Sequence, residues 1–159
     1  ILSNLEAILK ETQVLHQTGK NNYSEIEGLS KTFDKSRYKI VPYLEKELKI
    51  TLAAADLVVS RAGSGVIFEA AAFGKPMLLI PLKESANDHQ RANAYEAMKI
   101  GAAVVVEEQN LLPAIFMKEL QNILKMPGLS EKMREASRKF FKPDAAEAIA
   151  KEVFDLAIK

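Results

Sequence analysis

Residues 56–74 read DLVVSRAGSGVIFEAAAFG, and this stretch decides the fold. The apolar run over 56–60 predicts a strand, the glycine-rich residues 61–65 predict a turn, and 66–73 predicts a helix. The helix is expected to end at Gly74, because glycine readily takes the left-handed backbone conformation that follows many helices. A short buried strand that leads through a turn into a helix is typical of a parallel α/β sheet.

The same alternation continues on both sides of this stretch. Short apolar runs predict further strands, and apolar residues at helical spacing predict the helices between them. The sequence therefore predicts one Rossmann-like, doubly wound α/β domain over residues 1–159. The expected strands are 12–17, 38–41, 56–60, 76–81 and 102–106, and the expected helices are 1–11, 23–35, 45–54, 66–73, 89–99, 111–125, 129–140 and 144–157.

The composition excludes several classes of function. With 22 basic and 21 acidic residues, the formal net charge is +1, which argues against a nucleic-acid-binding surface. The absence of cysteine excludes a disulfide scaffold, and two histidines without nearby metal-ligand spacing argue against a zinc site. No apolar run approaches the roughly 20 residues that span a bilayer.

The turn after strand 56–60 is the first candidate site. Gly63 and Gly65 allow a ligand to approach the backbone closely, and the N–H groups at the start of the following helix favour an anion such as phosphate. Glu69, about one turn further on, could accept hydrogen bonds from two ribose hydroxyls. Alternatively, the glycines only make a tight turn and Glu69 caps or pairs locally. The glycine pattern alone is weak, because Phe68 replaces the third glycine of the dinucleotide fingerprint.

Two other polar clusters follow predicted strands. The segment from Asn87 to Asn93 opens the helix 89–99, with Asp88 as the expected N-cap and amide side chains suited to sugar hydroxyls. A capped, solvated helix start is the equally balanced alternative. His16, at the end of the first strand, is expected to be a hydrogen-bonding loop residue and not a catalyst.

Taken together, four motifs resemble the C-terminal domain of the MurG family of transferases. These motifs are HQTG at 16–19, ADLVVSRAG at 55–63, FEAAAFGKP at 68–76 and DHQRANA at 88–94. Members of that family move N-acetylglucosamine from its uridine diphosphate donor (UDP-GlcNAc) onto the lipid-linked muramyl-pentapeptide, lipid I, in peptidoglycan synthesis. The resemblance implies a two-domain, B-type glycosyltransferase fold in which the C-terminal domain binds most of the donor.

The resemblance implies roles for individual residues around the diphosphate. Ser64, Gly65 and Val66 match the helix start whose backbone meets the diphosphate and the sugar. Gly63 belongs to the same turn, and Arg61 is expected to support it.

Further roles concern the nucleoside and the sugar. Glu69 matches the glutamate that holds the ribose hydroxyls, and Gln90 with His89 matches a polar pair that contacts the sugar hydroxyls. The backbone of Leu44 is expected to meet the uracil. No metal or other cofactor is implied, because helix dipoles and side chains neutralise the leaving diphosphate in B-type enzymes.

The resemblance also implies that something precedes Ile1. In the family, a further strand and a phosphate-contacting turn open the C-terminal domain, and an N-terminal domain carries the acceptor site, the membrane-docking surface and the catalytic base. We therefore expect a missing strand between 12–17 and 56–60, no transferase activity of the chain alone and no catalytic residue within it. The full protein is expected to be cytoplasmic and peripheral on the inner face of the bacterial plasma membrane.

Three alternatives remain at this point. A sugar-nucleotide epimerase or a glycolipid synthase would use a related donor pocket on the same fold. A eukaryotic type of single-domain donor-binding subunit acts only with a membrane partner and also resembles this chain. The third is a generic Rossmann-like nucleotide-binding or interaction domain, in which Glu69 and Gln90 would have no ligand role.

Overall fold

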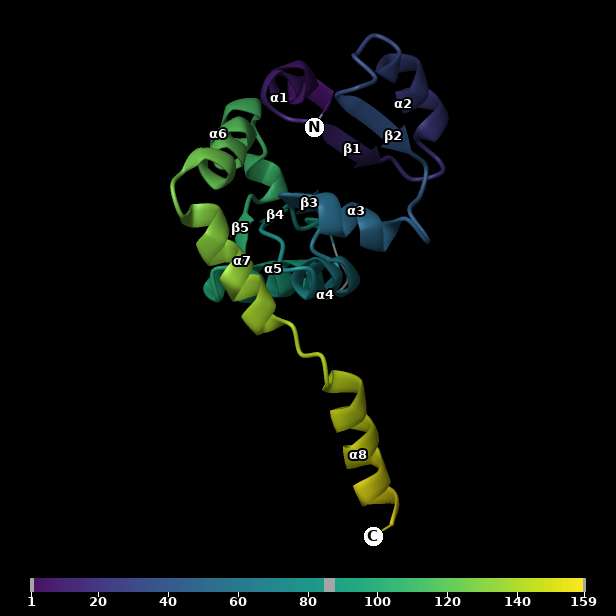
Figure 1. Cartoon of the computed structure of the whole chain (residues 1–159), viewed down its shortest axis with the longest axis vertical. Coiled ribbons are helices and arrows are strands. Elements are labelled where there is room, and N and C mark those ends of the chain that lie inside the picture. Colours follow the sequence, from purple (N-terminus) through teal and green to yellow (C-terminus); the bar gives the residue numbers. More distant parts are fainter. Residues whose placement is uncertain (1, 85–87, 159) are drawn as a thin grey trace. The chain divides into compact units, whose positions relative to one another are not determined.

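The computed structural model describes residues 2–84 and 88–158 and confirms an α/β protein with parallel strands (Figure 1). Ile1, where the first helix was expected to begin, and residues 85–87, which include Asn87 of the second polar cluster, lie outside the described residues. The chain divides into two compact units. Unit 1 comprises residues 1–54 and 112–118, and unit 2 comprises residues 55–111 and 119–159.

Unit 1 is a small parallel α/β layer. Strands β1 and β2 pair in parallel, with Val14 opposite Tyr38 and Gln17 opposite Val41. Leu5, Leu9 and Tyr38 form its buried core cluster, because the apolar face of the first helix packs against the sheet. Its elements are η1 (Leu2–Asn4), α1 (Leu5–Glu11), β1 (Val14–Gln17), α2 (Tyr23–Ser30), β2 (Tyr38–Val41), α3 (Leu48–Ala54) and the start of α6 (Pro113–Lys125).

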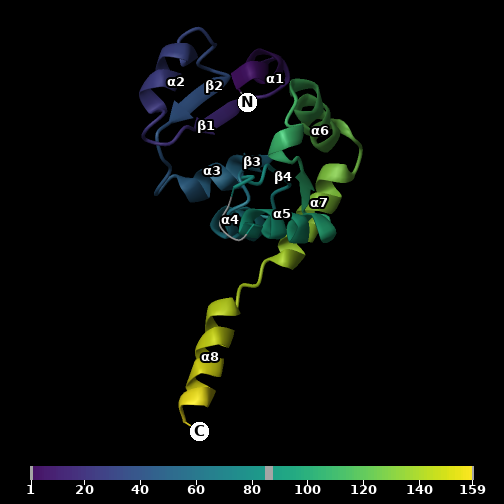
Figure 2. The same ribbon diagram turned by 180° about the vertical axis from the view of Figure 1, so that it is seen from behind.

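Unit 2 holds a three-stranded parallel sheet in the order β3-β4-β5. The middle strand is the most buried, with Met77 and Leu78 at 0% and Leu79 at 1% exposure, which explains why it reads as a continuous apolar run. Helices α4 and α5 lie beside each other along this sheet in both views (Figures 1 and 2). The elements are β3 (Val58–Ser60), α4 (Ser64–Ala72), β4 (Met77–Leu79), α5 (His89–Lys99), β5 (Ala103–Val105), η3 (Glu108–Asn110), α7 (Leu129–Phe140) and α8 (Ala145–Ala157).

The predicted elements all occur, but several boundaries differ. Helix α4 begins at Ser64, two residues before the predicted start, because Gly63 serves as its N-cap in an extended conformation. Helix α2 ends at Ser30 instead of residue 35. Beyond it, the N–H groups of Thr32 and Phe33 bond to carbonyls three residues back, which is a turn and not a continued α-helix.

The strands form two sheets, whereas the sequence predicted one. Among the described strands, β1 pairs only with β2, and β3 pairs only with β4, so each has one edge without a strand partner. A sheet edge exposes unpaired backbone N–H and C=O groups that can accept another strand. That a further strand lies between β1 and β3 stays a prediction.

Gly74 follows α4 as predicted, with φ at +60°. A β-carbon at this position would lie 2.8 Å from Cγ and Nε of Arg138 on α7. We expect Gly74→Ala to lower the free energy of unfolding by about 1–2 kcal/mol, the cost of a left-handed conformation for a non-glycine residue. Chemical denaturation measures this, and an unchanged midpoint would show that the helix end relaxes freely.

Candidate functional site

The turn between β3 and α4 presents a helix N-terminus with open backbone. Gly63 is the N-cap, with φ −67° and ψ 142°, and its carbonyl accepts the N–H of Ile67 at 3.2 Å. The N–H groups of Ser64, Gly65 and Val66 precede this first helical hydrogen bond, so the helix itself gives them no acceptor. Such a terminus favours an anionic ligand.

The two glycines of this turn are not required by the fold. Gly63 and Gly65 have no positive φ angle, and a β-carbon on either would meet no described atom within 4 Å beyond its chain neighbours and the backbone of α4. Gly65 lies inside α4, where a glycine costs about 0.5–1 kcal/mol relative to alanine. The space in front of the turn is therefore left open at some expense in stability, as a ligand-binding surface requires.

Glu69 lies on the same face of α4 as Gly65, because residues four apart superpose on a helix. Both residues are exposed, while Ile67 between them is buried and Phe68 stacks on Phe140 at 5.2 Å between ring centroids. Within residues 2–84 and 88–158, no hydrogen bond or ion pair involves the Glu69 carboxylate. Local capping or pairing, the alternative left open by the sequence, is thus not what Glu69 does in the described part of the chain.

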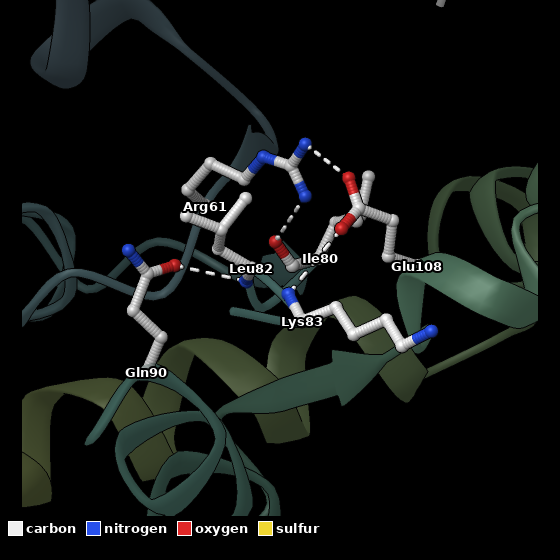
Figure 3. A network of polar contacts seen from close by, with 6 residues as sticks. All are labelled: Arg61, Ile80, Leu82, Lys83, Gln90 and Glu108. Carbon is white, nitrogen blue, oxygen red and sulfur yellow. Dashed lines mark hydrogen bonds and ion pairs between the residues drawn. The ribbon is translucent and has the colours of Figure 1, made fainter. Parts of the chain in front are cut away.

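The side chain of Arg61 contacts the end of β4, the middle strand of the three-stranded sheet. Its Nη1 donates to the carbonyl of Ile80 at 3.4 Å, and its Nη2 donates to Oε1 of Glu108 at 2.6 Å (Figure 3). The other carboxylate oxygen of Glu108 accepts the backbone N–H of Lys83 at 3.3 Å. The hydrogen bond from Arg61, followed by that from Lys83, holds the pKa of Glu108 below its ordinary value.

The start of α5 contacts the segment that follows β4. The side-chain oxygen of Gln90 accepts the N–H of Leu82 at 3.0 Å (Figure 3). Asn93, which was expected to suit sugar hydroxyls, instead donates its amide to the carbonyl of Ala62 at 3.3 Å and so ties α5 to the glycine turn. Asp88 occupies the N-cap position as predicted, but with φ 55° and without a side-chain capping hydrogen bond. His89 is the exposed first residue of α5.

A pocket of about 310 Å³ lies beside this network. Of its lining residues, Arg91 pairs with Glu107 at 2.9 Å. The hydroxyl of Tyr95, which is not a lining residue, donates to the same carboxylate at 2.9 Å. The lining residues are Leu82, Lys83, Asp88, Arg91, Glu107, Glu108 and Gln109.

Leu44 lies in unit 1, whereas the other eight predicted site residues lie in unit 2. Leu44 is partly buried, and its N–H donates to the side-chain oxygen of Gln17 at 2.9 Å. Near the end of β1, Nδ1 of His16 lies 2.8 Å from the Tyr38 hydroxyl, and burial lowers the pKa of His16. The contact agrees with the expectation that His16 is a hydrogen-bonding residue, but His16 lies within β1 and not in a loop.

Sequence reasoning missed Glu108 and Gln17 as neighbours of predicted site residues. Glu108 follows β5 as Arg61 follows β3, and carboxyl ends of parallel strands meet at one edge of a sheet. That rule, applied to strand 102–106, could have singled out Glu108.

The described residues contain no cluster of His, Cys, Asp or Glu able to hold a metal ion. Over the same described ranges, no helix has the length and apolar character needed to cross a membrane.

The chain is similar to known proteins over nearly its whole length. Residues 1–149 match the model of the glycosyltransferase family 28 C-terminal domain. A UDP-N-acetylglucosamine–N-acetylmuramyl-(pentapeptide) pyrophosphoryl-undecaprenol N-acetylglucosamine transferase of Caldicellulosiruptor saccharolyticus is 36% identical, with 89% of this chain and 38% of the relative covered. The protein of the same name in Desulfitobacterium hafniense is 34% identical, with 94% and 42% covered.

A solved structure agrees with these relatives. The crystal structure of MurG from Acinetobacter baumannii superposes with a TM-score of 0.77 at 25% identity, over 90% of this chain and 41% of that one. The chain thus spans about two fifths of the length of the proteins it matches. Because the family model matches residues 1–149 of 159, the chain belongs to the glycosyltransferase family 28 C-terminal domain family.

Proposed function

We propose that this chain is the donor-binding part of a glycosyltransferase that moves N-acetylglucosamine from UDP-GlcNAc to lipid I. The proposal rests on two features of the α4 surface. An open glycine turn at the helix N-terminus and the carboxylate of Glu69 share one face, and no described residue occupies either. Phosphates and ribose hydroxyls are the ligand groups that these two features match.

Each part of the donor has a proposed counterpart. The backbone of Gly63, Ser64, Gly65 and Val66 would bind the diphosphate, and Glu69 the ribose hydroxyls. The N–H groups and helix dipole of α4 would stabilise the charge that develops on the leaving diphosphate, without a metal ion.

The remaining roles concern residues at the edges of this surface. Gln90 and His89 would contact the sugar, and Arg61 would support the phosphate turn. The backbone of Leu44, in unit 1, would bind the uracil. In this structure the oxygen of Gln90 and the N–H of Leu44 hydrogen-bond within the chain, so each would exchange or share that partner on binding the donor.

The acceptor is proposed from the names of the relatives, which are transferases acting on the lipid-linked muramyl-pentapeptide. No residue of this chain is assigned to acceptor binding or to proton transfer. We also propose that the complete protein works in the cytoplasm, peripherally at the membrane that holds its lipid-linked acceptor.

Calorimetric titration tests the donor assignment. The protein expressed as its gene encodes it should bind UDP-GlcNAc in preference to the guanosine and adenosine diphosphate analogues, because the backbone of Leu44 would select the base. Transfer of radiolabelled N-acetylglucosamine to lipid I, measured on the same preparation, tests the reaction. Equal heats of binding for all three nucleotides would contradict the proposed base specificity. Donor binding without transfer to lipid I would contradict the proposed acceptor.

A further inference from the structure

The segment after β4 is held from both sides by side chains of other elements. Arg61 reaches it from the end of β3, Glu108 from the start of η3, and Gln90 from α5 (Figure 3). Since β4 lies between β3 and β5, the pair of Arg61 and Glu108 joins the two outer strands across the end of the middle one. One residue of this network, Glu108, has no role in the donor site as proposed above.

The two oxygens of Glu108 do different things. Oε2 accepts the backbone N–H of Lys83 at 3.3 Å, which fixes the carboxylate to the chain. Oε1 accepts from Arg61 at 2.6 Å, a charge-assisted hydrogen bond that fixes the guanidinium. Only a carboxylate offers two charged acceptors in this way, because the glutamine amide has one oxygen and one NH₂ group.

Because the ion pair of Arg61 and Glu108 is exposed, we expect it to position the Arg61 side chain more than to stabilise the fold. The side chains of Arg61 and Glu108 are 48% and 35% exposed, and ion pairs so open to solvent contribute little to folding. Without Glu108, however, the long Arg61 side chain would lose its shortest contact and gain rotamer freedom. A ligand would then have to order the guanidinium on binding.

We propose that Glu108 is a positioning residue of the donor site, which acts by holding the side chain of Arg61 against the end of β4. Arg61 opens the turn that is proposed above to bind the diphosphate. The inference rests on the proposed function for its ligand, although the ordering of Arg61 by Glu108 does not. The neighbouring carboxylate of Glu107 cannot take over this role, because it is bound to Arg91 and Tyr95.

The test uses Glu108→Gln, Arg61→Gln and the double variant in the protein as its gene encodes it. We expect Glu108→Gln to raise the Kd for UDP-GlcNAc about threefold to tenfold, between the effect of an exposed ion pair and that of a charged hydrogen bond. In the Arg61→Gln background the same change should have almost no further effect. The matched control is Glu96→Gln, which removes an equally charged, exposed partner of Lys99 at 2.9 Å on α5 and should leave the Kd unchanged.

A second readout does not depend on the donor. Nuclear magnetic resonance relaxation of the Arg61 Nε–Hε group should show an ordered side chain in the wild type and a mobile one in Glu108→Gln. Unchanged order of the Arg61 side chain in Glu108→Gln overturns the proposal. So does a Glu108→Gln effect on the Kd that is as large in the Arg61→Gln background as in the wild type, or a large fall in the Tm of Glu108→Gln. If the wild type does not bind UDP-GlcNAc, the proposed function fails, while the relaxation data still decide whether Glu108 positions Arg61.

Discussion

Glu69→Ala should raise the Kd for UDP-GlcNAc roughly 10- to 150-fold, since hydrogen bonds to a charged group are worth about 1.5–3 kcal/mol. The fold should be unaffected, because Glu69 is exposed and has no hydrogen bond or ion pair with another described residue. Alanine is also the best helix former, so the free energy of unfolding should stay the same or rise slightly. Calorimetry and thermal unfolding on one preparation measure both quantities.

A control separates this effect from the loss of a charge. Glu96→Ala removes an exposed carboxylate from the middle of α5 and should not change the Kd. Glu69 would be structural if its replacement lowered the Tm by many degrees while donor affinity persisted. Equal effects of the two replacements on affinity would point to long-range electrostatics in place of ribose binding.

Gly65→Ala should change stability and binding in opposite directions. The added methyl group meets no described atom within 4 Å and removes a glycine from the first turn of α4, so stability should rise by about 0.5–1 kcal/mol. The same methyl group would project into the space that the diphosphate needs. We expect affinity for UDP-GlcNAc to fall roughly 5- to 150-fold, the usual range of 1–3 kcal/mol for an overpacked contact.

Gly28→Ala is the matched control for this substitution. Gly28 lies within α2, and a β-carbon there also meets no described atom within 4 Å. It should stabilise the protein to a similar extent and leave donor binding unchanged. If Gly65→Ala stabilises the protein and binds the donor as tightly as the wild type does, the diphosphate does not lie against this turn.

The local elements could be predicted from the sequence because their signals are local. Periodic apolar residues and a terminal glycine placed α5 at 89–99 as the structure has it, and Gly74 ends α4 with the expected positive φ. A glycine-containing turn after β3, with Glu69 on the helix behind it, was likewise predicted, although the turn is shorter than the predicted 61–65 because α4 already begins at Ser64. Each of these features depends on residues within a few positions of one another.

The contacts among the side chains of the site were decided only by the tertiary structure. Arg61 and Glu108 are 47 positions apart, and Asn93 and the Ala62 carbonyl that it binds are 31 apart. Which of the charged residues pair, and whether an amide binds a ligand or the backbone, depends on the order and register of β3, β4 and β5. The sequence pattern identifies strands but does not encode their neighbours, because a pairing between distant segments is selected by the packing of the whole sheet and its helices.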